Sequence, residues 1–166
     1  MSPPGIAIIT AFVALGSQCL AQEPAELRDA RRAYEEGAQT ESARSRYLTK
    51  LVHMRERFAR AKGNAWKAID AQIMRHPAPP DPASLSAMMI GQWRSPRHDY
   101  IYRRDGTWSM LPVEPDTTAG TWHFEGNQCV ETNVLGSFRY TTLLLTAEDY
   151  VCTDGSVVFY RKRLPR

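Results

Sequence analysis

Apolar residues recur at helical spacing through the first part of this chain and at alternate positions through its last half. The helical pattern covers residues 24–62 and is strictest in a stripe of steps of four and three, formed by Tyr47, Leu51, Met54, Phe58 and Ala61. Such a stripe is typical of a helix that pairs with another helix. Gly37 and Thr40 mark a point where the long helix bends or breaks.

A second, shorter helix follows a stop-and-restart signal. Gly63 suits the left-handed residue that ends one helix, and Asn64 is a good N-cap for the next. The pattern then predicts a helix over residues 65–75, which pairs antiparallel with the first because the loop is short. The sequence therefore predicts a coiled-coil-like helical hairpin over residues 22–76. Residues 24–46 of its long arm have no cover in the short arm, which favours a partner or a second copy.

Alternating patterns predict a sheet after a proline-rich segment. Residues 77–84 hold four prolines and favour an extended linker, and residues 85–166 form the second unit. Three blocks in this unit set a tryptophan two residues after a glycine, at Trp93, Trp108 and Trp122. Eight strands are predicted, at about 91–95, 98–103, 107–112, 120–125, 128–133, 138–146, 150–153 and 156–163. The predicted fold class is α+β, with the helical hairpin followed by a small antiparallel β-meander or barrel of seven or eight strands.

Turn residues predict the register of three hairpins. A three-residue loop at 104–106 and two-residue loops at 126–127 and 154–155 gather the aromatic side chains on one face. These choices place opposite each other Tyr102 and Trp108, Phe124 and Cys129, Cys152 and Val157, and Tyr150 and Phe159.

Composition narrows the class of protein. The 166 residues are 43% hydrophobic and 23% charged, with a formal net charge of +3, as in ordinary globular proteins. Basic residues form no concentrated stripe, so we expect no nucleic-acid partner, and the basic tail 161–163 is interpreted as a solvated terminus. We expect no membrane span, because the longest apolar run, 6–15, is interrupted by Thr10.

The first 21 residues predict export. They contain no charged residue, and Cys19-Leu20-Ala21 fits signal-peptide cleavage before Gln22. A retained N-terminal segment and a lipid anchor at Cys19 are the alternatives. After cleavage two cysteines remain, Cys129 and Cys152, and an exported protein favours a disulfide between them. The alternative is two buried free thiols. The expected location is periplasmic or secreted.

Motifs for chemistry are few. The sequence has no Gly-x-Ser-x-Gly, no phosphate-binding glycine loop, no His-Glu-x-x-His and no Cys-x-x-Cys. Its four histidines are scattered, so we predict no catalytic residue, no metal site and no cofactor. His98 and Asp99 could meet His123 for acid–base work, although surface polar residues explain them better.

Two sets of residues are candidates for binding. An aromatic set could line an apolar pocket or stack on a sugar ring, and is otherwise plain core: Trp93, Tyr100, Tyr102, Trp108 and Trp122. A helical set could grip another chain, and is otherwise packed within this one: Tyr47, Leu51, Met54 and Phe58.

The glycine–tryptophan blocks resemble those of lipocalin-like β-domains. The helical hairpin ending Arg60-Ala61-Lys62-Gly63-Asn64 followed by such a domain resembles a group of exported bacterial proteins without an assigned activity. The resemblance covers roughly residues 27–163 and implies a meander or barrel and export. From residue 91 on only about 75 residues remain, fewer than in true lipocalins, which implies an interior filled by side chains.

These observations together predict an exported, non-enzymatic binding or interaction protein of the bacterial envelope. Its helices would associate with an unidentified protein or a second copy, and its β-domain would provide recognition. The alternative is a carrier of a small apolar ligand in a lipocalin-like barrel, and a lesser alternative is a hydrolase.

Overall fold

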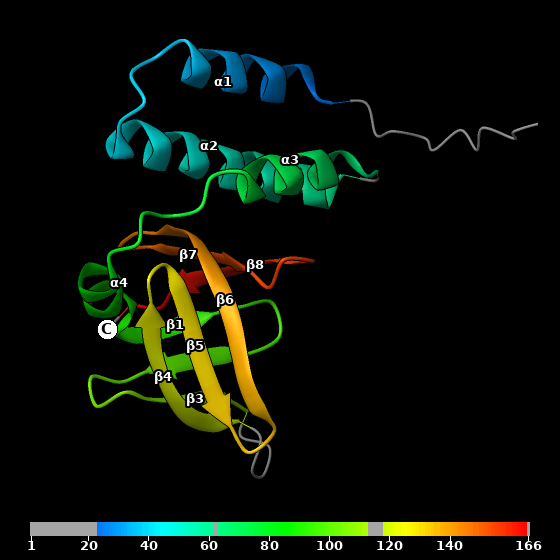
Figure 1. Cartoon of the computed structure of the whole chain (residues 1–166). Coiled ribbons are helices and arrows are strands. Elements are labelled where there is room, and N and C mark those ends of the chain that lie inside the picture. Colours follow the sequence, from blue (N-terminus) through cyan, green and yellow to red (C-terminus); the bar gives the residue numbers. More distant parts are fainter. Residues whose placement is uncertain (1–22, 62, 113–117, 166) are drawn as a thin grey trace, which may run out of the picture.

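The structure is a computed structural model that describes residues 23–61, 63–112 and 118–165. The predicted signal peptide, 1–21, lies outside these residues. A layer of helices covers one side of a barrel (Figure 1). The helices are α1 (Ala25–Glu35), α2 (Glu41–Arg60), α3 (Ala65–Met74) and α4 (Pro82–Met89). The strands are β1 (Gly91–Arg94), β2 (Asp99–Tyr102), β3 (Thr107–Leu111), β4 (Ala119–Glu125), β5 (Gln128–Asn133), β6 (Gly136–Leu145), β7 (Asp149–Thr153) and β8 (Val158–Arg163).

The eight strands form a closed antiparallel barrel in which each strand lies beside the next and β8 returns to β1. This confirms the predicted α+β class with a small barrel. Two predicted hairpin registers are also confirmed, since Tyr102 lies opposite Trp108 and Phe124 lies opposite Cys129. Gly106 has the predicted positive φ, 79°, which a glycine adopts without steric strain.

The predicted register of the last hairpin is wrong. Cys152 lies opposite Phe159 rather than Val157, so the loop spans residues 154–157. The side chain of Asp154 explains the wider loop, because it accepts hydrogen bonds from the backbone N–H groups of Ser156 (2.8 Å) and Val157 (2.9 Å). Val157 is consequently 54% exposed instead of facing the interior.

The predicted long first helix is two helices, α1 and α2, separated at residues 36–40. The break lies where Gly37 and Thr40 predicted it, and the Thr40 hydroxyl caps α2 by accepting from the Ala43 N–H at 3.1 Å. α1 folds back over α2 (Figure 1). Leu27 and Ala30 of α1 are buried there, so the part of the helix predicted to lack cover has it within the chain.

The helices and the barrel share a hydrophobic core, which we call the interlayer core. Aliphatic side chains of α1, α2 and α3 meet the outer face of β6, β7 and β8. Its buried members include Leu48, Leu51, Ile69, Ile73, Leu143, Leu144, Val151 and Val158. The barrel interior holds a second cluster, which α4 joins through Leu85 and Met89.

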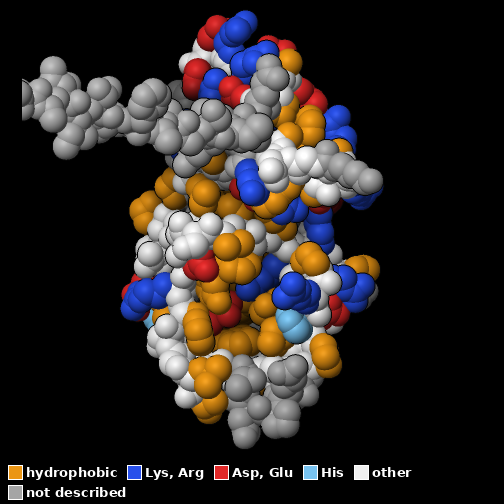
Figure 2. Space-filling model, turned by 90° about the vertical axis from the view of Figure 1, so that its right-hand side faces the viewer, with side chains coloured by type: hydrophobic (Ala, Val, Ile, Leu, Met, Phe, Trp, Pro, Cys, Tyr) orange, Lys and Arg blue, Asp and Glu red, His pale blue; other side chains and the backbone are white. Residues whose placement is uncertain are grey.

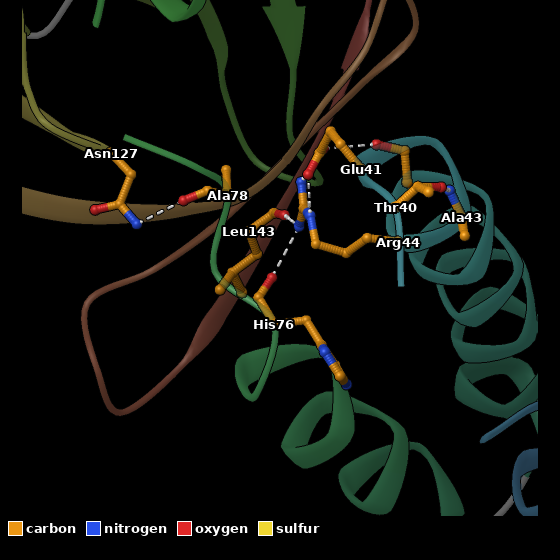
Figure 3. Close-up of polar contacts among 9 residues, drawn as sticks. Thr40, Glu41, Ala43, Arg44, His76, Ala78, Asn127 and Leu143 are labelled. Carbon is orange, nitrogen blue, oxygen red and sulfur yellow. Dashed lines mark hydrogen bonds and ion pairs between the residues drawn. The ribbon is translucent and has the colours of Figure 1, made fainter. Parts of the chain in front are cut away.

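The proline-rich segment is bound to the barrel rather than free of it (Figure 3). The Ala78 N–H donates to the Thr142 carbonyl at 2.8 Å, and the Asn127 side chain donates to the Ala78 carbonyl at 2.9 Å. Arg44 joins α2 to the same place, because its Nη1 donates to the carbonyls of His76 (2.9 Å) and Leu143 (2.7 Å). The helical layer and the barrel are thereby held in contact.

None of the helices in the described part of the chain is long and apolar enough to cross a membrane.

Candidate functional site

The barrel has its shortest strand pairing where it closes, between β1 and β8. β7 pairs along β8 from Val158 to Lys162. β1 pairs only with the end of β8, through Trp93 opposite Arg163 and Arg94 opposite Lys162. The first part of β8 therefore has β7 on one side and, on the side of β1, the β1–β2 loop, residues 95–98, in place of a strand. We call this gap the seam.

A pocket of about 390 Å³ lies at the seam. Its wall consists of the loop residues 95–98, the β8 residues 158–161, Tyr100 of β2 and Arg55 of α2. Figure 2 shows a hollow in the barrel with hydrophobic side chains around it, charged side chains within it and a histidine beside it. The volume is near the lower end of the range for small-molecule sites, roughly 300–1,000 Å³.

Arg161 brings a positive charge to this pocket although its side chain is almost fully buried, at 4% exposure. Its Nη1 donates to the Tyr102 hydroxyl and lies 3.4 Å from Oε1 of Glu131, which is 3% exposed. The Tyr102 hydroxyl in turn donates to the same Glu131 oxygen. A buried ion pair with a shared hydroxyl thus lies inside the barrel.

Tyrosine rings surround the Arg161 guanidinium. Its Cζ lies 3.8 Å from the ring centroid of Tyr100 and 5.3 Å from that of Tyr150, distances at which cation–π attraction is significant. Burial raises the pKa of Tyr100, and it raises that of Tyr140 to about 12. The phenols therefore stay protonated and uncharged at neutral pH.

Arg55 carries a second guanidinium to the rim. Its Nε lies 3.3 Å from Oδ1 of Asp70, and its Cζ lies 4.6 Å from the ring of Tyr160. The Tyr160 hydroxyl donates to the same Asp70 oxygen at 2.6 Å. Burial raises the pKa of the Asp70 carboxyl, against the opposing effects of Tyr160 and Arg55. Through this network α2 and α3 hold one edge of the seam pocket.

The residues that line the pocket are basic rather than acidic. Its wall includes three arginines and a histidine, Arg55, Arg97, Arg161 and His98, and no aspartate or glutamate among the described residues. Nδ1 of His98 is buried without a hydrogen-bond partner. Two of these cations have acidic partners next to the wall, since Arg161 is paired with Glu131 and Arg55 with Asp70.

The predicted aromatic set lies in the barrel interior. Trp93, Tyr102, Trp108 and Trp122 are buried in the interior cluster, and only Tyr100 also lines the seam pocket. The interior is therefore largely filled by its own side chains, as the short strand region implied.

The predicted acid–base residues do not assemble. Asp99 accepts two hydrogen bonds from Arg94, at 2.8 and 2.9 Å. His123 is exposed on the outer face and lies 3.0 Å from Glu125. His98 alone of the three lines the pocket.

The remaining predicted residues lie within the fold. Tyr47, Leu51 and Met54 are buried in the interlayer core, and Phe58 packs against it.

Cys129 and Cys152 are buried in the barrel as free thiols, so the predicted disulfide is not formed in this structure. The two cysteines lie on strands separated by β6: Cys129 of β5 is opposite Tyr140, and Cys152 of β7 is opposite Thr142. Burial raises the pKa of Cys152 to about 11.

The two charged residues at the centre of the site were missed. The basic segment 161–163 predicts a solvated tail, and Glu131 belongs to no predicted site. A signal for both exists, because Arg161 lies two residues after Phe159 and Glu131 two residues after Cys129, each predicted to face inward. Because side chains alternate between the two faces of a strand, Arg161 and Glu131 then both point into the barrel.

Comparison with protein-family profiles, with curated proteins and with solved structures finds no match for this chain. No group of three or more histidine, cysteine or acidic side chains suited to a metal ion occurs in residues 23–61, 63–112 and 118–165.

Proposed function

We propose that this protein is a non-enzymatic binding protein that holds a small organic molecule in the seam pocket. The observation that carries the proposal is a buried guanidinium, that of Arg161, at the wall of a pocket formed otherwise by aromatic and aliphatic side chains, the loop residues 95–98 and Arg55. A mostly apolar concavity with a few polar groups is the usual form of a small-molecule site.

The stability of the barrel does not explain the buried charges. Replacing a buried ion pair by well-packed apolar side chains is often neutral or stabilising. Arg161 and Glu131 lie among tyrosines, tryptophans and cysteines that could fill a barrel without them. Orientation of a ligand is a role that apolar side chains could not fill.

The other predicted functions have less support. The helical stripe proposed for a partner is covered by the chain's own helices and barrel. Asp99 and His123, proposed for hydrolysis, each have another partner. A carrier or sensor of a small molecule remains the best supported class.

We further propose that the protein is exported, on the sequence of residues 1–21 alone. Expression of the full chain in a bacterial host, followed by mass measurement of the periplasmic fraction, tests this. A mature chain beginning at Gln22 supports export, and an intact cytoplasmic chain contradicts it.

Fluorescence of the neutral apolar probe N-phenyl-1-naphthylamine tests the binding function. The wild-type protein should enhance the probe's emission saturably. His98→Trp places a large ring at the pocket wall and should weaken binding at least tenfold. His123→Trp, on the exposed outer face, is the matched control and should bind as the wild type does. Absence of saturable binding to the wild type, or equal binding by both variants, contradicts the proposal.

A further inference from the structure

We infer that the ligand is a small ring compound bearing a carboxylate, which binds the Nε–Nη2 edge of Arg161. This inference rests on the function proposed above and adds the chemical class of the ligand.

The hydrogen bonds of Arg161 leave one edge of the guanidinium available. Nη1 makes the contacts with Tyr102 and Glu131, so neither contact uses Nε or Nη2. The phenol of Tyr100 also interacts with the guanidinium, which lowers the pKa of that phenol against the larger effect of its burial. Nε and Nη2 form a planar pair of donors that matches the two oxygens of a carboxylate. Arg161 itself lines the seam pocket.

The aromatic rings determine the direction of approach. The Arg161 guanidinium lies over the ring of Tyr100, with Cζ 3.8 Å from the centroid, and the centroid of Tyr150 lies 5.3 Å from Cζ. The N–H groups of a guanidinium point outward in its own plane, so an oxyanion binds it from that direction. In-plane approach favours an oxyanion over a second stacked ring.

The charges around Arg161 favour an anion in spite of Glu131. Glu131 accepts from Nη1 and from Tyr102, so it is already oriented and need not move. Arg97 adds positive charge at the wall, and Arg55 lies there paired with Asp70. The lining residues themselves include no described carboxylate. A volume of about 390 Å³ suits a ring with a short acidic arm rather than a long acyl chain.

Displacement of N-phenyl-1-naphthylamine by a matched pair of probes tests the inference. 1-Naphthaleneacetate and 1-naphthaleneacetamide have nearly the same shape and differ in charge. The acid should displace the probe at a concentration about tenfold lower than the amide does, since a hydrogen bond to a charged group is worth roughly a factor of ten or more.

Two variants move this preference in opposite directions. Glu131→Gln removes the competing negative charge and should tighten binding of the acid roughly threefold to tenfold, with the amide unchanged. The double variant Arg161→Gln, Glu131→Gln leaves no lone buried charge and should bind acid and amide equally. Arg104→Gln, in the β2–β3 loop and outside the pocket wall, is the control and should keep the wild-type preference.

The outcomes separate the inference from the proposed function. If the fluorescent probe binds but the amide competes as well as the acid, the inference that the ligand carries a carboxylate is wrong, and the proposal that the seam pocket binds a small molecule is retained. Retention of the preference in the double variant would assign it to another cation and overturn the role of Arg161. Glu131→Gln leaves Arg161 without its buried partner, so should either variant fail to fold, the acid-over-amide preference of the wild type decides. If the wild type binds neither the fluorescent probe nor the acid, the proposed function itself fails.

Discussion

The interlayer core and the barrel interior differ in the chemistry of their buried side chains. Between the helices and the barrel, buried side chains such as Leu48, Leu51 and Ile73 are aliphatic and make no polar demands. Inside the barrel, the rings of Tyr102 and Tyr150 lie beside the buried Arg161 and Glu131. The first arrangement yields stability from burial alone. The arrangement inside the barrel is stable only if each buried charge is paired, and apolar side chains could fill the same space without that requirement. Ligand binding is therefore the better explanation for the charges inside the barrel.

The largest expected effect tests whether the barrel interior depends on pairing. Arg161→Gln alone leaves Glu131 buried without its cation, and the free energy of unfolding should fall by about 3–5 kcal/mol. Adding Glu131→Gln should recover most of that loss, because no buried charge is left alone. Urea unfolding followed by tryptophan fluorescence measures both. Equal losses in the single and double variants would show that the pairing matters little.

The interlayer core should respond to volume instead. Leu51→Ala removes a fully buried side chain and should lower the free energy of unfolding by about 2–4 kcal/mol. The folded variant should bind N-phenyl-1-naphthylamine as the wild type does, since Leu51 does not line the seam pocket. Val134→Ala, at a side chain 73% exposed, is the control and should change stability by less than about 0.5 kcal/mol. Loss of probe binding by folded Leu51→Ala would show that the two regions are coupled.

The junction between the two regions has a smaller expected effect. Arg44→Met removes the donor to the His76 and Leu143 carbonyls and should cost about 1–3 kcal/mol of unfolding free energy. Arg46→Met, on an exposed position of the same helix, should cost little. Thermal unfolding of both variants makes the comparison. A junction that contributes nothing would leave the two variants equally stable.

The smallest expected effect is a pH dependence at the same junction. Burial, with smaller contributions from Arg44 and Arg75, lowers the pKa of His76 below its usual 6.5. The unfolded chain then takes up this proton first as pH falls. The contribution of His76 to stability is therefore complete above about pH 6.5 and declines below it. His76→Gln should flatten the slope of stability against pH between about pH 7 and 5.5, whereas His53→Gln, at an exposed position, should not. An unchanged slope in His76→Gln would assign the dependence elsewhere.

Much of the barrel was predictable because its order is local. Each strand pairs with the next, so the predicted loops at 104–106 and 126–127 were sufficient to obtain the pairings of Tyr102 and Phe124. The loop at 154–157 was not predictable from the Asp-Gly dipeptide, because the Asp154 carboxylate stabilises a wider turn by binding two backbone N–H groups. Likewise the helical pattern predicted helix from 24 to 62, while the fold back of α1 onto α2 depends on contacts across the Gly37–Thr40 break.

The site was predictable only in part. The aromatic set was correctly gathered on one face, since alternation assigns faces without knowledge of the closure. Arg161 and Glu131 follow the same alternation but were assigned to no site, because a basic segment near a chain end is normally solvated. Arg161 of β8 and Glu131 of β5 come into contact only because the barrel closes, with β8 returning to β1.

The order of hydrophobic and polar residues alone therefore determined the strands, most hairpin pairings and which side chains face inward. Those are consequences of a period of two and of turn chemistry, which act over a few residues. Tertiary structure alone decided that Arg161 meets Glu131 and Tyr102, that Arg55 reaches the seam, and that the helices cover β6–β8. These contacts join residues far apart in the chain, and they form only when the barrel closes and the helical layer packs against it.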